Sequence, residues 1–236
     1  MRMEHLEATN YIRLVGTATG SPEFSHSSRG KDFYVFPLTA ARLSGNTDTL
    51  NILLRREQLA DLPIQAQDRL CVEGEVRSFN SRKGTGARLV ITVLAREIAP
   101  CEEEDSNLVV LRGTLCRLPT LRTTPMGREI CDLMLAVNRP YGRSDYLPCI
   151  CWGLSAREAS GWGVGTVVRL DGRLQSRDYI KLTDDGPLHR TAFEISATTI
   201  RLIPETACSP AEDTRSPAYD SAAYAPFPPE DSRAQS

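Results

Sequence analysis

Hydrophobic and polar residues alternate over short stretches along most of this chain. The clearest stretch is 130–138, where Cys131, Leu133 and Leu135 fall on one face and the residues between them on the other. This period of two is typical of β-strands, and turn-forming residues separate one stretch from the next. In the second half of the chain the pattern predicts a helix-like segment at 154–163 and strands near 107–116, 130–138, 145–152, 165–175 and 191–203. A long loop is expected at 178–190.

The same order of residues occurs twice. Matches follow a constant offset of 97, as in the pairs Asn10 and Asn107, Gly16 and Gly113, Arg42 and Arg139, and Asp48 and Asp145. After one added residue the offset becomes 98, which pairs Gly74 with Gly172 and Ser78 with Ser176. So many identities in one register indicate an internal repeat of about 95 residues.

Each repeat contains short strands with a helical turn after the third strand. A sheet this short has exposed edges, and closure into a small barrel removes them. The predicted fold is therefore all-β, with two tandem five-stranded barrels. We expect the barrels at 10–98 and 107–203, joined by an acidic linker at 99–106. The polar residues 1–9 and the Pro-rich acidic tail 204–236 are expected to be disordered.

The net charge of −2 hides an uneven distribution. Residues 1–99 carry +2 and residues 107–203 carry +4, whereas 100–106 and 204–236 carry −4 each. Acid is concentrated in the connecting segments, so the two barrels should be mildly basic. Neither a secretory signal nor an apolar run of about 18 residues is found, which predicts a cytoplasmic protein.

The residues that usually carry metal or catalytic chemistry are dispersed. The seven cysteines form no C-x-x-C pair, and several fall in apolar strand patterns where thiols act as small hydrophobic groups. No Ser/His/Asp or Cys/His arrangement is visible. A nuclease that holds a metal with Asp145, Asp171 and Asp178 is the enzymatic alternative. The prediction is a protein without catalytic activity, metal or cofactor.

Aromatic residues gather in the second repeat. Tyr146 and Trp152 are six residues apart on one predicted strand and should share its outer face, opposite Leu147, Cys149 and Cys151 in the core. Tyr141 precedes this strand, and Tyr179 lies at the edge of the 178–190 loop. Aromatic rings stack on the bases of single strands while basic side chains follow the phosphates. The candidate phosphate-binding residues are Arg139, Arg143, Arg173, Arg177 and Lys181. The alternative is that the rings belong to the core or to a subunit interface.

Several motifs of the second repeat occur together in one known family. They are N-x-V-x-L-x-G-T at 107–114, P-x-x-R-x-T-x-x-G at 119–127, L-A-V-N-R at 135–139, D-Y-L-P at 145–148, C-W-G at 151–153 and G-R-L-Q-S-R-x-Y at 172–179. With these motifs the chain resembles the bacterial single-stranded DNA-binding proteins. The resemblance implies oligonucleotide/oligosaccharide-binding (OB) barrels, no catalysis, and base stacking at Tyr141, Tyr146, Trp152 and Tyr179.

The resemblance also implies an assembly and a role for the tail. Two-barrel relatives pair as homodimers, which would bring four barrels together. The family's tail ends in acidic residues and an Ile-Pro-Phe type tip that recruits replication and repair proteins. Here Pro226 and Phe227 lie near Glu230 and Asp231 in a different order, so recruitment by the tail stays open.

The first repeat lacks the four rings. Ser44, Thr49, Arg55 and Ser81 occupy the corresponding positions. Weaker, largely electrostatic DNA contacts are expected there, from Arg55, Arg56, Phe79, Arg82 and Lys83. Phe79 is either a substitute ring or a packed strand residue.

The leading functional hypothesis is non-catalytic binding and protection of single-stranded DNA in replication, recombination or repair. An OB-fold module for protein interaction, of the primosome-accessory type, is the alternative. RNA binding is a variant of the leading hypothesis, because a stacking platform does not by itself select the sugar.

Overall fold

The computed structural model describes residues 9–81, 88–140, 142–183 and 186–204. Within these ranges, the side chains of residues 81, 88, 179, 181–183 and 188–190 lie outside the description. The predicted disordered segments fall almost entirely outside the described residues. Within the described part of the chain, no helix has the length and apolar character needed to cross a membrane.

The first half of the chain forms a closed barrel. Its strands are β1 (Asn10–Ala18), β3 (Lys31–Ala41), β4 (Thr47–Arg55), β5 (Arg69–Ser81) and β6 (Arg88–Pro100). The sheet runs β3-β4-β6-β5-β1 and closes through pairing of β1 with β3. The short strand β2 (Glu23–Ser28) extends β3 as a hairpin, and α1 (Arg56–Asp61) follows β4.

The second half repeats this arrangement. The barrel strands are β7 (Ser106–Leu115), β9 (Glu129–Arg139), β10 (Arg143–Trp152), β11 (Val167–Thr183) and β12 (Gly186–Leu202). The sheet runs β7-β11-β12-β10-β9 and closes through β7 and β9. The short strand β8 (Thr120–Thr123) pairs with β9, and α2 (Gly153–Ser160) follows β10. The predicted fold class of two tandem five-stranded barrels is confirmed.

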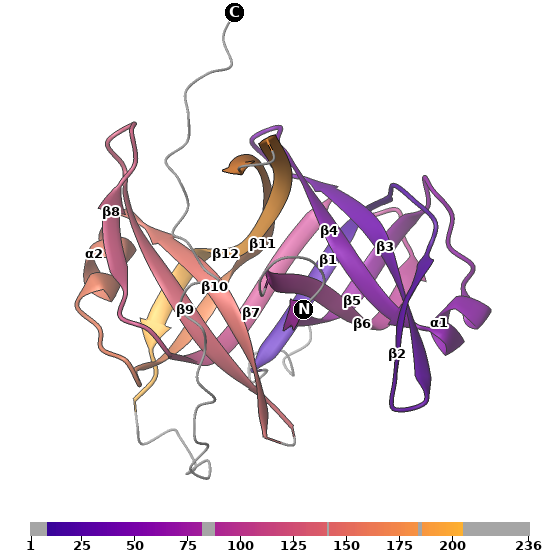
Figure 1. Ribbon diagram of the computed structural model, residues 1–236, viewed down its shortest axis with the longest axis horizontal. Coiled ribbons are helices and arrows are strands. Elements are labelled where there is room, and N and C mark those ends of the chain that lie inside the picture. Colours follow the sequence, from indigo (N-terminus) through magenta and orange to yellow (C-terminus); the bar gives the residue numbers. More distant parts are fainter. Residues whose placement is uncertain (1–8, 82–87, 141, 184–185, 205–236) are drawn as a thin grey trace, which may run out of the picture.

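The two barrels lie side by side and share one continuous sheet (Figure 1). Strands β1 and β7 pair in antiparallel register, with Ile12 opposite Val109. These two residues match each other in the internal repeat, so a local two-fold relation between the barrels passes through this pair. The repeated asparagines have the same role on both sides. Asn10 exchanges side-chain hydrogen bonds with the backbone of Val76, and Asn107 does so with Leu174.

The repeated glycines explain how such small barrels bend. Register shifts occur next to Gly74 in β5 and Gly172 in β11. A Cβ atom at Gly74 would lie 2.1 Å from the Leu94 carbonyl oxygen, and one at Gly172 would lie 2.2 Å from that of Ser196. Only glycine lets the neighbouring strand approach this closely, which is the reason for its recurrence in strand interiors.

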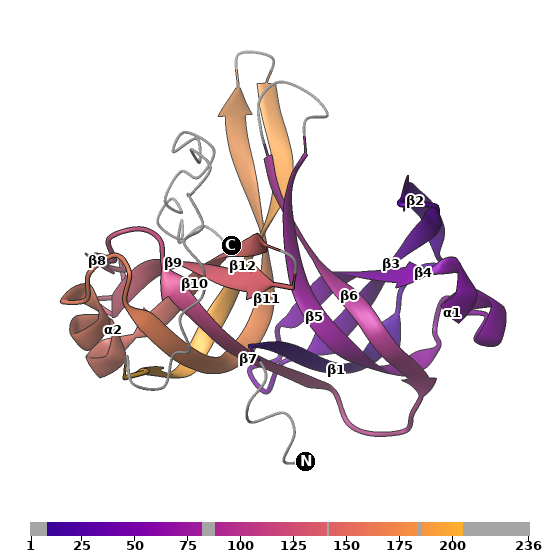
Figure 2. The same ribbon diagram turned by 90° about the horizontal axis from the view of Figure 1, so that it is seen from below.

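The predicted long loop at 178–190 is wrong. Strands β11 and β12 continue as a paired ladder from Asp178 and Thr191 to Thr183 and Gly186, and they form an arm that projects from the body (Figure 2). The polar residues of this segment suggested a loop, but an antiparallel ladder satisfies backbone groups whatever the side chains are. Sequence reading also missed the edge strands β2 and β8.

The acidic connection between the barrels is held against the first barrel. Glu103 accepts a 2.7 Å contact from Arg13, and Asp105 lies 2.7 Å from Arg69. Asp105 also accepts a hydrogen bond of 2.6 Å from the backbone N–H of Ala41. The linker acids therefore neutralise first-barrel arginines and limit how freely the barrels can separate.

Candidate nucleic-acid interface

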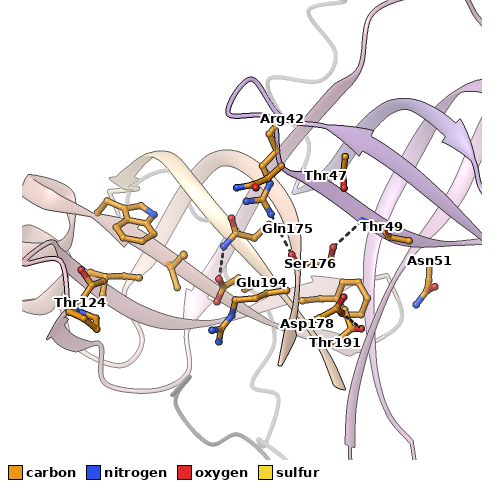
Figure 3. A pocket seen from close by; sticks show the side chains of 18 of the residues that line it. Arg42, Thr47, Thr49, Asn51, Thr124, Gln175, Ser176, Asp178, Thr191 and Glu194 are labelled. Carbon is orange, nitrogen blue, oxygen red and sulfur yellow. Dashed lines mark hydrogen bonds between the residues drawn. The ribbon is translucent and has the colours of Figure 1, made fainter. Parts of the chain in front are cut away.

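A groove of about 850 Å³ runs between the two barrels (Figure 3). The second barrel supplies its floor from β10, β11 and β12, and the first barrel supplies a wall from β4 and the β3–β4 turn. This composite groove, called the groove below, is open to solvent and combines apolar, acidic and basic side chains.

Trp152 provides the aromatic surface of the groove. It ends β10 with 39% of its surface exposed, and its indole N–H lies 3.4 Å from the Ser196 hydroxyl. Ile130 and Ile150 line the groove beside it. The predicted alternation along β10 is confirmed, because Leu147, Cys149 and Cys151 point into the core and are at most 1% exposed. The buried core on one face thus places the Trp152 ring outward.

A carboxylate and an amide form the polar part of the floor. The Gln175 amide on β11 donates a hydrogen bond to Glu194 Oε1 on β12. Glu194 is only 6% exposed, and burial raises the pKa of its carboxyl group. The Gln175 hydrogen bond and the positive charges of Arg177 and Arg122 act in the opposite direction on that pKa. Arg122 itself is ion-paired with Asp132.

The first barrel closes the groove with small polar side chains. Thr47, Thr49 and Asn51 lie along β4 on that side (Figure 3). The backbone N–H of Thr49 donates a hydrogen bond of 2.9 Å to the Ser176 hydroxyl of the second barrel. The position that corresponds to the ring Tyr146 is thus a groove wall in the first barrel.

Tyr146 has a different environment from Trp152. Its side chain is half-buried, and its backbone N–H donates a hydrogen bond of 2.8 Å to the Ser78 hydroxyl in β5. Tyr146 does not line the groove, whereas Ile150 and Trp152 on the same face of β10 do. The structure therefore places Tyr146 and Trp152 on the predicted outer face of β10, but at separate points along the contact between the barrels.

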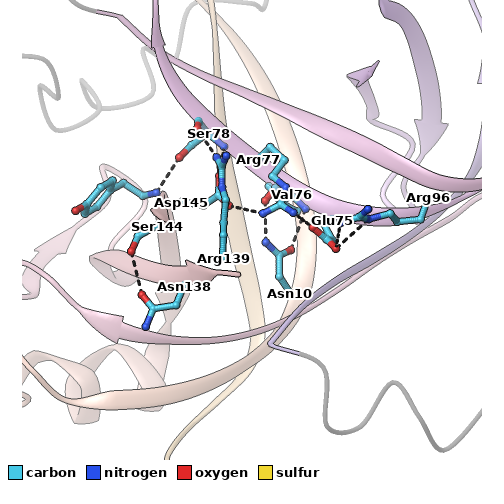
Figure 4. Close-up of polar contacts among 11 residues, drawn as sticks. Asn10, Glu75, Val76, Arg77, Ser78, Arg96, Asn138, Arg139, Ser144 and Asp145 are labelled. Carbon is cyan, nitrogen blue, oxygen red and sulfur yellow. Dashed lines mark hydrogen bonds and ion pairs between the residues drawn. The ribbon is translucent and has the colours of Figure 1, made fainter. Parts of the chain in front are cut away.

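The candidate phosphate ligands fall into distinct groups. Arg139 donates to Asp145 at 2.6 Å and to the Ser78 carbonyl oxygen at 2.9 Å, so it joins the barrels (Figure 4). Arg143 is exposed at the start of β10, and Arg177 lines the groove. Arg173 is half-buried, and burial lowers the pKa of its guanidinium. Of these residues, Arg143 and Arg177 have the placement expected of a phosphate ligand.

The first-barrel candidates are also separated. Arg55 is half-buried, and Arg56 is exposed 3.6 Å from Asp32. Phe79 is 47% exposed, so about half of its ring is accessible, as a substitute stacking ring requires. The candidates Tyr141, Arg82 and Lys83 lie outside the described residues, as do the side chains of Tyr179 and Lys181.

The three aspartates of the nuclease alternative have separate partners. Asp145 is buried between Arg139 and Arg77, Asp171 contacts Arg169, and Asp178 accepts a hydrogen bond from Thr191. Among the described residues, no three His, Cys, Asp or Glu side chains gather as a metal site would require.

Sequence reasoning missed much of the groove. Ile150 precedes Trp152 by two residues, and this strand period could have placed it beside the ring. Gln175 and Glu194, in contrast, meet only through the β11–β12 register, and the wall residue Thr49 comes from the other barrel. No local pattern brings residues this far apart in sequence together.

Comparison with known proteins agrees with this architecture. Residues 106–203 match the family model described as the single-strand binding protein family. A single-stranded DNA-binding protein of Halalkalibacterium halodurans is 38% identical over 80 residues, which cover 31% of this chain and 48% of that protein. Single-stranded DNA-binding protein A of Bacillus subtilis is 36% identical over 80 residues, which cover 31% and 46%. The chain thus spans about half the length of the curated relatives that it matches.

A solved structure extends the similarity to both barrels. A deletion mutant of the single-stranded DNA binding protein from Thermus aquaticus superposes with a TM-score of 0.67 at 26% identity, and the match covers 86% of this chain and 98% of that one. The similarity thus includes the first barrel, which lies outside the region of the family match. Residues 106–203 thus match the single-strand binding protein family, and both barrels together have the fold of the Thermus aquaticus protein.

Proposed function

We propose that this protein binds and protects single-stranded DNA, without catalysis, during replication, recombination or repair. The observation that carries the proposal is the exposed Trp152 ring beside an open groove of about 850 Å³ that also contains Arg177. An aromatic face binds any base, and basic side chains follow the backbone, so the combination suits a strand of arbitrary sequence.

The proposal assigns base stacking chiefly to the second barrel. Trp152 and Tyr146 are the described rings on the outer face of β10, and Tyr141 and Tyr179 are assigned the same role by resemblance. Arg143 and Arg177 are assigned to phosphates. Each stacked base contributes roughly 1–3 kcal/mol of binding free energy. Of the exposed rings Phe24 and Phe79 of the first barrel, Phe79 is assigned to DNA, together with polar and basic side chains.

We also propose a homodimer with four barrels, located in the cytoplasm with the nucleoid. The resemblance supports this assembly, and the arm of β11 and β12 exposes Ile180, 56% accessible, as an apolar contact for a second copy. Mass measurement in solution tests it, and a monomer at micromolar concentration would rule it out.

Fluorescence titration with oligo-dT tests DNA binding. The chain has two tryptophans, and Trp162 packs partly buried against the core. Trp162→Phe therefore leaves Trp152 as the reporter. We expect quenching by oligo-dT at low salt and weaker binding as salt rises, because bound phosphates release counterions. Unchanged emission together with no gel-shift of labelled oligo-dT would refute the proposal.

A further inference from the structure

The groove contains one acceptor that stacking and phosphate binding leave unused. Glu194 is only 6% exposed, and its Oε2 atom has no hydrogen-bond partner among the described residues. Its other oxygen accepts the Gln175 amide, whose carbonyl oxygen in turn faces Arg173 at 3.3 Å. These two hydrogen bonds fix the Glu194 carboxylate in one orientation and leave its Oε2 atom to accept from a ligand. A buried polar atom without a partner costs free energy, so a ligand that supplies a donor gains affinity there.

The acceptor lies close to the stacking ring. Trp152 contacts Ser196 through its indole N–H, and Glu194 is two residues from Ser196 on the same strand. Two residues along a strand span roughly 6.6 Å, about the width of a nucleobase. A base on the Trp152 face can therefore direct its hydrogen-bonding edge toward Glu194.

We propose that Glu194, oriented by Gln175, reads the edge of a base in the groove and favours amino-bearing bases over thymine. This inference rests on the proposed DNA binding and adds a base preference to it. Cytosine presents its N4 amino group as a donor. Acidic side chains accept a hydrogen bond from that group when proteins read base edges in double-stranded DNA. Thymine presents the acceptor O4 at the same position, which a carboxylate repels.

The groove has the surroundings that such readout needs. In the first-barrel wall, Thr47, Thr49 and Asn51 are neutral and the charge of Arg42 is paired with Asp48. Glu194 is therefore the charged acceptor opposite that wall. Asp178 also lines the groove, but it is exposed and accepts a 2.6 Å hydrogen bond from Thr191. The degenerate first repeat thus contributes to a base site through its wall.

The test measures affinity for oligo-dC and oligo-dT of about 16 nucleotides, a length that one barrel can engage. It is performed at one fixed, mildly alkaline pH, because burial raises the pKa of Glu194. The informative quantity is Kd for oligo-dT divided by Kd for oligo-dC, because differences in oligomer flexibility are the same for every variant. Glu194→Gln, which keeps the side-chain shape, should lower this ratio at least about fivefold relative to the unmodified protein.

Asp178→Asn is the matched control, since it removes one negative charge from the same groove. It should change both affinities by a similar factor and leave the ratio intact. A ratio that Glu194→Gln leaves unchanged would overturn the inference while DNA binding stands. Failure to bind either oligomer would instead overturn the proposed function.

Oligo-dU provides a second readout with the unmodified protein. Uracil lacks the thymine methyl group but keeps the carbonyl oxygens. Base-edge reading predicts that oligo-dU binds as oligo-dT does. Binding of oligo-dU as tight as that of oligo-dC would show that the groove excludes the methyl group, and would contradict a role for Glu194.

Discussion

The buried carboxylate of Asp145 in the second barrel accepts a hydrogen bond of 2.6 Å from the backbone N–H of Ser78 in the first barrel. The same contact occurs in the matching positions, where Asp48 accepts from the N–H of Ser176 at 2.8 Å. Both aspartates are fully buried. The repeated aspartate and serine positions thus form two reciprocal contacts that join the barrels. Arg42 and Arg139 are ion-paired with these aspartates and belong to the same contacts.

Asp145→Asn should destabilise the protein strongly. Asp145 contacts both Arg139 and Arg77, the latter at 2.9 Å, and the substitution leaves two guanidinium groups without their shared anion. Removing one partner of a buried ion pair costs about 3–5 kcal/mol of unfolding free energy. Urea denaturation measures it, with the exposed Asp61→Asn as control. Equal urea midpoints for Asp145→Asn and Asp61→Asn would contradict the role of Asp145 as the shared anion of the two arginines.

Asp48→Asn should cost less than Asp145→Asn. Asp48 is paired with Arg42, but the position that matches Arg77 is Gln175, which donates to Glu194 instead. Asp145→Asn therefore removes one more guanidinium contact than Asp48→Asn, that of Arg77, which keeps its ion pair with Glu75. Unfolding free energies are again compared. A larger loss for Asp48→Asn than for Asp145→Asn would contradict the importance of the additional Arg77 contact.

Glu194→Gln should stabilise the protein at neutral pH. Burial raises the pKa of Glu194, so the folded state holds a proton that the unfolded state releases earlier. The contribution of Glu194 to stability is complete below the unfolded pKa and is lost as pH rises through the folded pKa. The variant should thus gain stability relative to the unmodified protein as pH increases from acidic to neutral. Thermal unfolding at both pH values, with Asp178→Asn as control, checks this. A difference that does not change with pH would contradict it.

Gly172→Ala should destabilise the second barrel. The new Cβ would lie 2.2 Å from the Ser196 carbonyl oxygen, a backbone atom that cannot move aside without shifting β12. Overpacking of this kind costs about 1–3 kcal/mol or more. Gly163→Ala is the control, because nothing lies within 4 Å of a Cβ there. Chemical denaturation should show a lower stability for Gly172→Ala than for Gly163→Ala. Similar stabilities would contradict the close approach of β12 as the reason for glycine at position 172.

The repeat made much of the fold predictable. The internal repeat, with matches such as Gly74 and Gly172, and alternation such as that around Cys131 predicted two copies of a short sheet, and closure of its edges predicted the barrels. The same alternation placed Trp152 outside and Cys151 inside. The arm at 178–190 was not predictable in this way, because its stability comes from pairing between β11 and β12 rather than from apolar alternation.

The contacts between the barrels were beyond local reasoning. Arg139 was expected at phosphates because its charge alone was visible, whereas its partner Asp145 is fully buried and accepts a hydrogen bond from Ser78 of the other barrel. Glu194 gave no signal, because a single acid in a strand is ordinarily solvated. Its meaning depends on Gln175 beside it and on the wall around Thr49.

The most direct test of the central claim compares Trp152→Ala with Phe79→Ala. These substitutions each remove one exposed ring, 39% and 47% accessible, from the second and the first barrel. Anisotropy of labelled oligo-dT, measured at one fixed salt concentration, gives both affinities. If the second barrel carries most of the base stacking, Trp152→Ala loses about 1–3 kcal/mol, roughly 5- to 150-fold in Kd, and Phe79→Ala loses clearly less. An equal or greater loss for Phe79→Ala would contradict the claim.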